Sequence, residues 1–260
     1  MQNRQNASKP LPLEGAFNVR DLGVYRNGYG RKLQEHRLLR SDGTQYLTEG
    51  DLNYLREYGL IGSVDLRSDW ECQHAPSRLR GVPGLFYERI SLQDGIQSNG
   101  FAGGFPSSLG ALYVDLLKNS GEKLAQVWRI LSRCQDGCVL FHCSAGKDRT
   151  GVVAMLALLS VGVDPETILT DYEVSEPNMR EAFARQKKAA SAAGIQMPDY
   201  LFGSEREDLE QALSYITDNF GTVEAYLTSI GLSEEEILSV AKALDTKAGA
   251  PAAFGEEASA

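Results

Sequence analysis

The chain of 260 residues has no long hydrophobic run at any point. Its longest apolar stretch, residues 152–163, is well short of the about 20 residues that a membrane-spanning helix needs. The first residues contain no apolar segment of the kind found in secretory signal peptides. We therefore expect a protein without stable membrane insertion, which is either cytoplasmic or secreted by a route without an N-terminal signal peptide.

Cysteine and positive charge are also scarce. Four cysteines, Cys72, Cys134, Cys138 and Cys143, are too few and too unevenly spaced for the disulfide framework of a small secreted scaffold. Lys and Arg number 26 against 35 Asp and Glu, which gives a net charge of −9. Such a surface repels polyanions, so nucleic acid is not an expected partner and neither is an anionic membrane. The sequence leaves the oligomeric state open.

Hydrophobic spacing predicts one domain, in which short strands come first and mostly helices follow. We expect a loose arm at residues 1–12, a single domain at 13–244 and a disordered tail at 245–260. The run Cys138-Val139-Leu140-Phe141 is continuously apolar, as is typical of a buried central strand. Two further strands are expected, one at 63–66 and one at 85–90, and the second lies within a long irregular loop. Helices are expected at 48–59, 165–174, 177–193, 205–219, 223–230 and 234–244. The segment 109–131 is also expected to be helical, with a break at 119–121.

The segment that carries chemistry follows the buried strand and precedes an apolar helix. It reads HCSAGKDRTG, residues 142–151. If the chain curls between Cys143 and Arg149, its backbone N–H groups point inward and the helix N-terminus adds a positive end, which makes an anion site. Gly146 permits the backbone conformation that such a curl requires. The residues expected to hold phosphate are Ser144, Ala145, Gly146, Lys147 and Thr150.

Within such a loop, Cys143 is expected to ionise readily, because the amides, the helix terminus and Arg149 all favour a thiolate. The planar guanidinium of Arg149 can hold two oxygens of a phosphoryl group and follow them into the transition state. Thr150 can donate its hydroxyl to the sulfur. His142 is expected to orient the loop through its neighbouring backbone. This pattern predicts a cysteine nucleophile for phosphoryl transfer.

The segment matches the H-C-x5-R-[ST] signature of cysteine-dependent phosphatases. The chain as a whole resembles the atypical bacterial and fungal tyrosine phosphatases with a C-x2-G-K-D-R loop, which include secreted mycobacterial and listerial enzymes. Four further segments carry this resemblance: FNVRDLG (17–23), LLRSDG (38–43), VDLRSDWE (64–71) and FGTVEAYL (220–227).

The resemblance implies a tyrosine-phosphatase-like α/β fold, with a central, mostly parallel sheet flanked by helices and an extra helical lid pair at about 175–205. It also implies a phosphomonoester hydrolase that acts on phosphotyrosine through a phosphocysteine intermediate, without a cofactor or a metal. Phosphoserine, phosphothreonine and phosphoinositides are further implied substrates. Lys147 would pair with the second phosphate of an inositol head group.

The proton donor to the leaving group is less clearly marked, because the sequence has no WPD triplet. Asp148 is the first candidate, by analogy with the myotubularins. Asp65 is the second, since it would end a strand beside the nucleophile strand, although an ion pair with Arg67 or Arg40 is an equal alternative. Asp94 is a weaker third candidate.

Several other features of the sequence allow more than one interpretation. Arg40 either lines the pocket and binds a substrate oxygen or holds loops together, and four cations at 180–188 either steer substrates to a lid or form a solvated face. A zinc site at Cys134, Cys138 and His142 has poor geometry for one strand. The alternative functions are a catalytically silent module that reads phosphorylated partners and, among enzymes, a sulfur transferase or arsenate reductase.

Overall fold

The computed structural model describes residues 7–92 and 105–245, and its centre is a five-stranded sheet in the order β1-β2-β5-β3-β4. Its strands are β1 (Arg20–Asp21), β2 (Leu38–Ser41), β3 (Leu60–Asp65), β4 (Phe86–Arg89) and β5 (Cys138–His142). Only β1 runs antiparallel to its neighbour. The predicted mostly parallel α/β sheet is therefore confirmed, with the apolar strand β5 at its centre.

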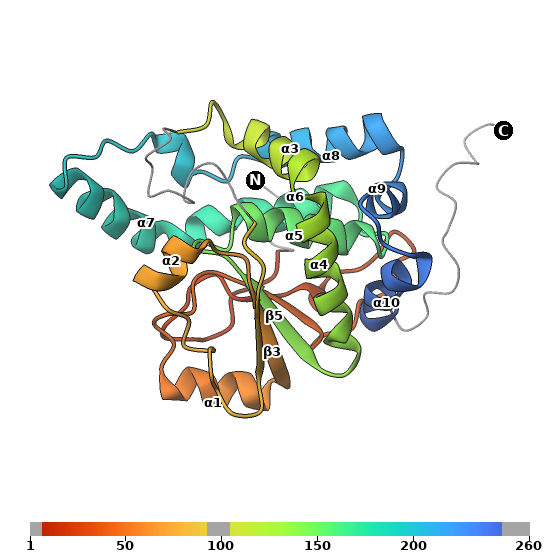
Figure 1. Cartoon of the computed structure of the whole chain (residues 1–260), viewed down its shortest axis with the longest axis horizontal. Helices are drawn as coiled ribbons and strands as arrows, with labels where there is room; N and C mark the ends of the chain where they lie inside the picture. Colours follow the sequence, from red (N-terminus) through yellow and green to blue (C-terminus); the bar gives the residue numbers. More distant parts are fainter. Residues whose placement is uncertain (1–6, 93–104, 246–260) are drawn as a thin grey trace.

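Helices cover both faces of the sheet (Figure 1). Alternate residues of β5 divide between two hydrophobic clusters: Val139 and Phe141 pack among the C-terminal helices, whereas Leu140 packs on the other face with residues of α1. The helices are α1 (Glu49–Glu57), α2 (Asp69–His74), α3 (Leu109–Asn119), α4 (Gly121–Leu131), α5 (Asp148–Leu159), α6 (Pro165–Glu173), α7 (Ser175–Ala192), α8 (Arg206–Phe220), α9 (Val223–Ser229) and α10 (Glu234–Leu244).

Side-chain caps account for several helix starts. Thr48 and Asp51 form the capping box of α1, and Ser68 and Glu71 form that of α2. The break predicted at residues 119–121 separates α3 from α4. The other helices lie within a few residues of their predicted bounds, except α2, which the sequence did not predict. Among the described residues, no helix is both long enough and apolar enough to cross a membrane.

The two chain ends differ from the sequence expectation where they are described. Ser8 lies in the arm expected to be loose, yet its N–H donates to the Tyr25 hydroxyl and its own hydroxyl donates to the carbonyl of Asp21. Asp245, the first residue of the expected tail, is buried and accepts hydrogen bonds from Asn27 and Arg31. These contacts extend the ordered domain by a few residues. Residues 246–260 and Asp94 lie outside the described residues.

Candidate active site

The loop from Cys143 to Lys147 joins the end of β5 to the start of α5. Its carbonyl groups point away from the loop centre, because those of Ser144, Ala145 and Gly146 all accept hydrogen bonds from surrounding elements. The donors are the Gly43 amide at 3.0 Å, the Asn18 side-chain amide at 3.0 Å and the Arg40 guanidinium at 2.7 Å, respectively. Since the N–H of a trans peptide is directed opposite to its carbonyl, the following amides turn toward the loop centre. The loop is therefore an anion-binding nest at a helix N-terminus.

Gly146 makes this curl possible. Its φ is +65°, a left-handed conformation that side chains other than glycine rarely adopt. A Cβ atom at this position would also lie 2.6 Å from the backbone nitrogen of Asp42 and from the backbone of Ser41. The loop thus passes directly against the end of β2, and both conformation and space require glycine.

Cys143 and Thr150 are both buried at the base of the loop. The hydroxyl oxygen of Thr150 has no hydrogen-bond partner in the described part of the chain, so the bond expected from Thr150 to the thiol is not formed in this structure. His142 is buried and its Nδ1 lies 3.1 Å from the carbonyl oxygen of Cys143. Burial lowers the pKa of His142, which leaves a neutral ring that orients the backbone, as predicted.

Arg149 is held by Glu71, a residue that sequence reasoning missed. Its two terminal nitrogens each lie 2.8 Å from one Glu71 oxygen, which makes a bidentate pair. The same carboxylate accepts the N–H of Ser68 and the hydroxyl of Ser144. Burial alone would raise the pKa of Glu71, but its hydrogen bonds and attraction to Arg149 prevail and lower it to about 2. Glu71 is thus ionised and fixes the direction of the Arg149 side chain.

Asp148 begins α5 and lies on the wall of the cleft. Its Oδ1 accepts a hydrogen bond of 2.6 Å from the hydroxyl of Tyr113, a buried residue of α3 that the sequence did not single out. Lys147 Nζ is 3.3 Å from the same oxygen. Of the acid candidates within the described residues, Asp148 is therefore the one that lines the cleft.

Asp65 is not placed to donate a proton, which corrects its assignment as a second acid. The residue does end β3 beside the nucleophile strand, paired with His142, but its side chain is fully buried. Both carboxylate oxygens bind Arg67, at 2.9 and 2.7 Å, and Oδ2 also accepts the Tyr87 hydroxyl. Burial alone would raise the pKa of Asp65, but the charge of Arg67 and the hydrogen bonds from Arg67 and Tyr87 lower it well below the usual range. Asp65 is the structural partner of Arg67.

Lys147 also differs from its expected role. Its side chain is buried, and Nζ donates to the carbonyl oxygens of Leu201 at 2.9 Å and Gly203 at 2.6 Å. These carbonyls belong to the short 3-10 turn η4 (Asp199–Phe202) and the residue after it. The ammonium group therefore ties the loop to the segment that follows α7, and it does not present a site for a second phosphate.

Arg40 supports the loop from behind and does not bind a substrate oxygen. It is buried, donates to the carbonyl of Gly146, and forms an ion pair with Asp171 of α6. Asp171 also binds Arg20 at 3.1 Å. Of the two readings that the sequence left open, the structure supports the one in which Arg40 holds neighbouring segments together.

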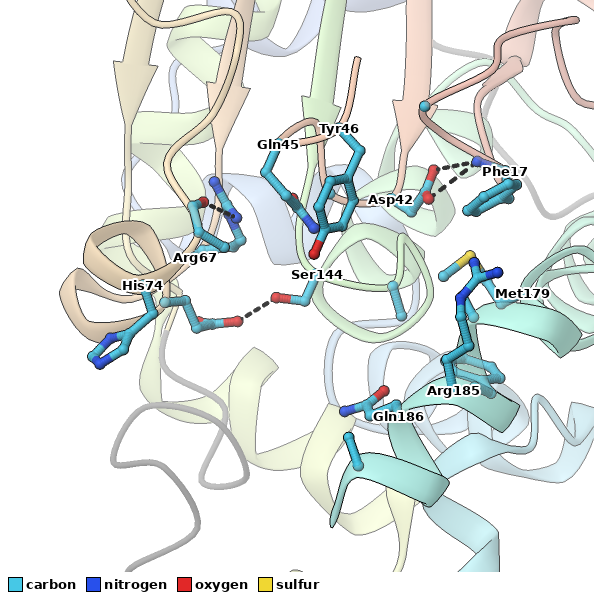
Figure 2. Close-up of a pocket in the computed structure, with 18 of the residues that line it drawn as sticks. Phe17, Asp42, Gln45, Tyr46, Arg67, His74, Ser144, Met179, Arg185 and Gln186 are labelled. Atoms are coloured by element: carbon cyan, nitrogen blue, oxygen red, sulfur yellow. Dashed lines mark hydrogen bonds between the residues drawn. The ribbon is translucent and has the colours of Figure 1, made fainter. Parts of the chain in front are cut away.

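A cleft of about 910 Å³ opens above the loop (Figure 2). Ser144, Ala145 and Asp148 line one part of it, Tyr46 and Trp70 contribute exposed aromatic rings, and α7 forms the opposite wall. Gln186 of α7 faces Ser144 across this space in Figure 2, whereas Arg185 extends over the ring of Phe17. Arg185 is the one of the four cations at 180–188 that lines the cleft. The movement of the 175–205 segment as a lid stays a prediction.

The remaining cysteines have no arrangement for metal binding. Burial raises the pKa of Cys134 to about 12, and it raises that of Cys138 as well. Within residues 7–92 and 105–245, no group of three or more His, Cys, Asp or Glu side chains could hold a metal ion.

Comparison with known proteins finds matches in sequence and in structure. The model of the tyrosine phosphatase family matches residues 11–245. A tyrosine-protein phosphatase of Nostoc commune is 36% identical over 200 residues, which cover 74% of this chain and 68% of that protein. The triple specificity protein phosphatase PtpB of Mycobacterium tuberculosis is 27% identical, with 86% of this chain and 95% of that protein covered. The crystal structure of TpbA from P. aeruginosa superimposes with a TM-score of 0.45 at 14% identity, covering 87% of this chain and 98% of that one.

Proposed function

The chain belongs to the tyrosine phosphatase family, and from this premise we propose that Cys143 is its nucleophile, Arg149 its phosphate-binding cation and Asp148 its general acid. The Cys143 thiolate attacks the phosphorus of phosphotyrosine, the S–P bond forms, and the P–O bond to the phenol breaks. Asp148 supplies the proton that the departing phenolate takes up. Water then attacks the phosphocysteine and gives a proton to the Asp148 carboxylate; the S–P bond breaks, which releases inorganic phosphate, restores the thiolate and returns Asp148 to its protonated form.

The observation that carries this proposal is the direction of the loop peptides. Three successive carbonyls are bonded to groups outside the loop, which leaves amide donors for the three nonbridging oxygens of a phosphoryl group. The N-terminus of α5 adds its positive end at the same place. Such preorganised donors stabilise a charge that develops during the reaction without having to rearrange.

Arg149 and Glu71 provide the second element of the proposal. A guanidinium whose direction is fixed by a bidentate carboxylate needs no reordering when the phosphoryl oxygens move into the equatorial plane. Glu71 is accordingly a positioning residue. The bond from Ser144 to Glu71 further links this pair to the loop.

The dimensions and lining of the cleft support phosphotyrosine as the main substrate. Tyr46 and Trp70 offer exposed aromatic surface on the wall of this cleft, against which a phenyl ring can pack. Phosphoserine, phosphothreonine and phosphoinositides extend this proposal, with support from the name of the mycobacterial relative. A panel of phosphopeptides and phosphoinositides at matched concentrations tests this extension; hydrolysis of phosphotyrosine alone would remove it.

A rapid-mixing experiment with p-nitrophenyl phosphate tests the covalent step. We expect a burst of one equivalent of p-nitrophenol followed by steady turnover, because the phosphocysteine accumulates before it is hydrolysed. Cys143→Ser should abolish both phases, and a Cys134→Ser control should retain both. A Cys143→Ser protein that still turns over would refute the nucleophile assignment, and binding of phosphotyrosine without any turnover by the unaltered chain would favour the reader module.

Two reagents test the reaction class independently. Vanadate, which adopts the trigonal-bipyramidal geometry of the transition state, is expected to inhibit, and EDTA is expected to leave activity unchanged. Loss of activity in EDTA that added divalent metal restores would contradict the proposed scheme.

A further inference from the structure

Tyr113 of α3 lies beneath the start of α5, where its hydroxyl meets the carboxyl group of Asp148. We propose that Tyr113 is a positioning residue that holds the Asp148 carboxyl group in the orientation for proton transfer to the leaving group. This inference rests on the proposed acid role of Asp148. It adds a residue from a helix that none of the sequence motifs includes.

The contacts of Asp148 are asymmetric. Oδ1 receives the Tyr113 hydroxyl at 2.6 Å and lies 3.3 Å from Lys147 Nζ. In the described part of the chain, no hydrogen bond ends on Oδ2. Since a carboxyl group is planar, fixing one oxygen from below restricts rotation of the whole group. Asp148 also lines the cleft, so Oδ2 is the oxygen left for a substrate.

A second phenol determines the direction of the Tyr113 hydrogen bond. The hydroxyl of Tyr172, from α6, is 2.7 Å from that of Tyr113. Because Tyr113 has a single hydroxyl proton and donates it to Asp148, Tyr172 must donate in turn to Tyr113. Both rings are buried and meet edge to face, with centroids 6.0 Å apart. The two side chains thus form a short chain of donors that ends at the carboxyl group.

The surroundings keep this chain intact. Burial, together with the nearby Asp148, raises the pKa of Tyr113 well above its ordinary value, and burial does the same for Tyr172. Both phenols therefore stay protonated and able to donate. Asp208 of α8 is a further charged group that interacts with Asp148 and Lys147. The acid thus lies where α3, α6 and α8 meet the start of α5, and it is not a side chain on a free loop.

Positioning of an acid has a measurable signature that packing does not. Proton donation matters most when the leaving group is a weakly acidic phenol and least when it is a strongly acidic one. A misplaced acid therefore steepens the dependence of kcat/KM on the leaving-group pKa. A general loss of folded protein instead lowers kcat/KM by the same factor for every substrate. Aryl phosphates whose phenols range from strongly acidic to as weak as tyrosine, with a pKa of about 10, supply the required series.

The experiment compares Tyr113→Phe, Asp148→Asn and the double variant on this series. Tyr226→Phe is the matched control, because its buried hydroxyl bonds the carbonyl of Leu117 on the same helix α3 but lies outside the site. We expect Tyr113→Phe to lose about tenfold in kcat/KM on the weakest phenol and much less on the strongest, as suits the loss of one buried hydrogen bond. For the control, the dependence of kcat/KM on leaving-group pKa should have the same slope as for the unaltered protein.

The outcomes separate the two proposals. If the plot of log kcat/KM against leaving-group pKa has the same slope for Tyr113→Phe as for the unaltered protein but a steeper slope for Asp148→Asn, the acid role stands and the positioning role of Tyr113 is overturned. If Asp148→Asn is not steeper, both fail, while the burst experiment on Cys143 still decides the covalent mechanism. Tyr113 acting through Asp148 requires the double variant to be no slower than Asp148→Asn alone, and additive losses would overturn it.

Thermal unfolding of each variant checks that it is folded. Should Tyr113→Phe fail to fold, Tyr172→Phe carries the same test, because it removes the donor to Tyr113 and leaves Tyr113 bonded to Asp148. A smaller loss that is again confined to weakly acidic phenols is then expected. A parallel loss across the series would overturn the inference.

Discussion

Four buried arginines each form an ion pair with a buried carboxylate: Arg20, Arg40, Arg67 and Arg149. Three of them hold the scaffold, because they join the sheet to α6 or brace the end of β3. The sequence presents all four in similar motifs, so residue type and spacing did not distinguish the arginine of the phosphate loop from the structural ones except through the C-x5-R spacing. Their partners became evident only from the contacts.

Glu71→Gln tests how far the orientation of Arg149 matters. An amide oxygen can replace only one of the two charge-assisted bonds, so we expect kcat/KM for p-nitrophenyl phosphate to fall about ten- to a hundredfold. Glu49→Gln is the control, since Glu49 pairs with Arg78 at the surface. Equal activity of the two variants would mean that Arg149 orients itself without Glu71.

Lys147→Ala tests the structural reading of the loop lysine. Because Nζ binds the carbonyls of Leu201 and Gly203, we expect similar losses on phosphotyrosine and phosphoinositide substrates, together with faster proteolytic cleavage near residues 193–203. Lys187→Ala, which removes an exposed contact to Asp199 of the same segment, should have little effect. A loss confined to inositol lipids would restore the second-phosphate role.

At the level of elements, the phosphate loop depends on its contact with β2. Gly146→Ala places a Cβ against the backbone of Asp42 and Ser41 in a left-handed conformation, whereas Gly194→Ala meets the same conformation, with a φ of +75°, in open space. We expect Gly194→Ala to cost about 1 kcal/mol of unfolding free energy and Gly146→Ala clearly more, with loss of activity. Urea unfolding and turnover measure both, and equal costs would show that the loop can move away from β2.

The elements themselves were largely predictable. Local signals determine them: the capping pair Thr48 and Asp51, the apolar tetrad of β5, and the helical spacing after residue 109 gave strands and helices within a few residues of those observed. For Asp65 the sequence left a proton donor and an ion pair with Arg67 or Arg40 equally open, and the structure shows the pair with Arg67. The role of Lys147 was not predictable, because it depends on a partner that only the tertiary fold supplies. For Lys147 the partner is a pair of backbone carbonyls, which carry no signature in the sequence.

On the scale of the whole molecule, buried carboxylates determine the response to acid. Attraction to Arg20 and Arg40 outweighs burial and lowers the pKa of Asp171 to about 2, and Glu71 behaves likewise beside Arg149. A carboxylate with a lowered pKa in the folded state contributes stability that is fully present above about pH 4 and is lost as the pH falls toward 2. We expect the urea midpoint of the unaltered protein to fall as the pH is lowered from about 4 toward 2. The Asp171→Asn variant should have a lower midpoint at pH 6, and its midpoint should fall less over the acidic range. Parallel curves would contradict the assignment.

Asp42 is expected to act in the opposite direction. Burial raises its pKa to about 6 despite hydrogen bonds from the amides of Phe17 and Asn18. The stability that follows from a raised carboxyl pKa is present below about pH 4 and is lost as the pH rises through 6. Asp42→Asn should therefore reduce the change of the urea midpoint between pH 4 and 6 and leave its pH dependence below pH 4 unchanged. An unchanged slope between pH 4 and 6 would show that Asp42 titrates normally.

The buried ammonium group of Lys147 has a consequence for chemical labelling. An amine that is enclosed between two carbonyls cannot react with an acylating reagent until the turn η4 moves away from it. The rate at which Lys147 is acetylated therefore measures how often this segment opens. Mass spectrometry can follow the acetylation in the unaltered protein. A phosphate-site inhibitor that slows this acylation would reveal that occupation of the loop and closure of the segment after α7 favour one another.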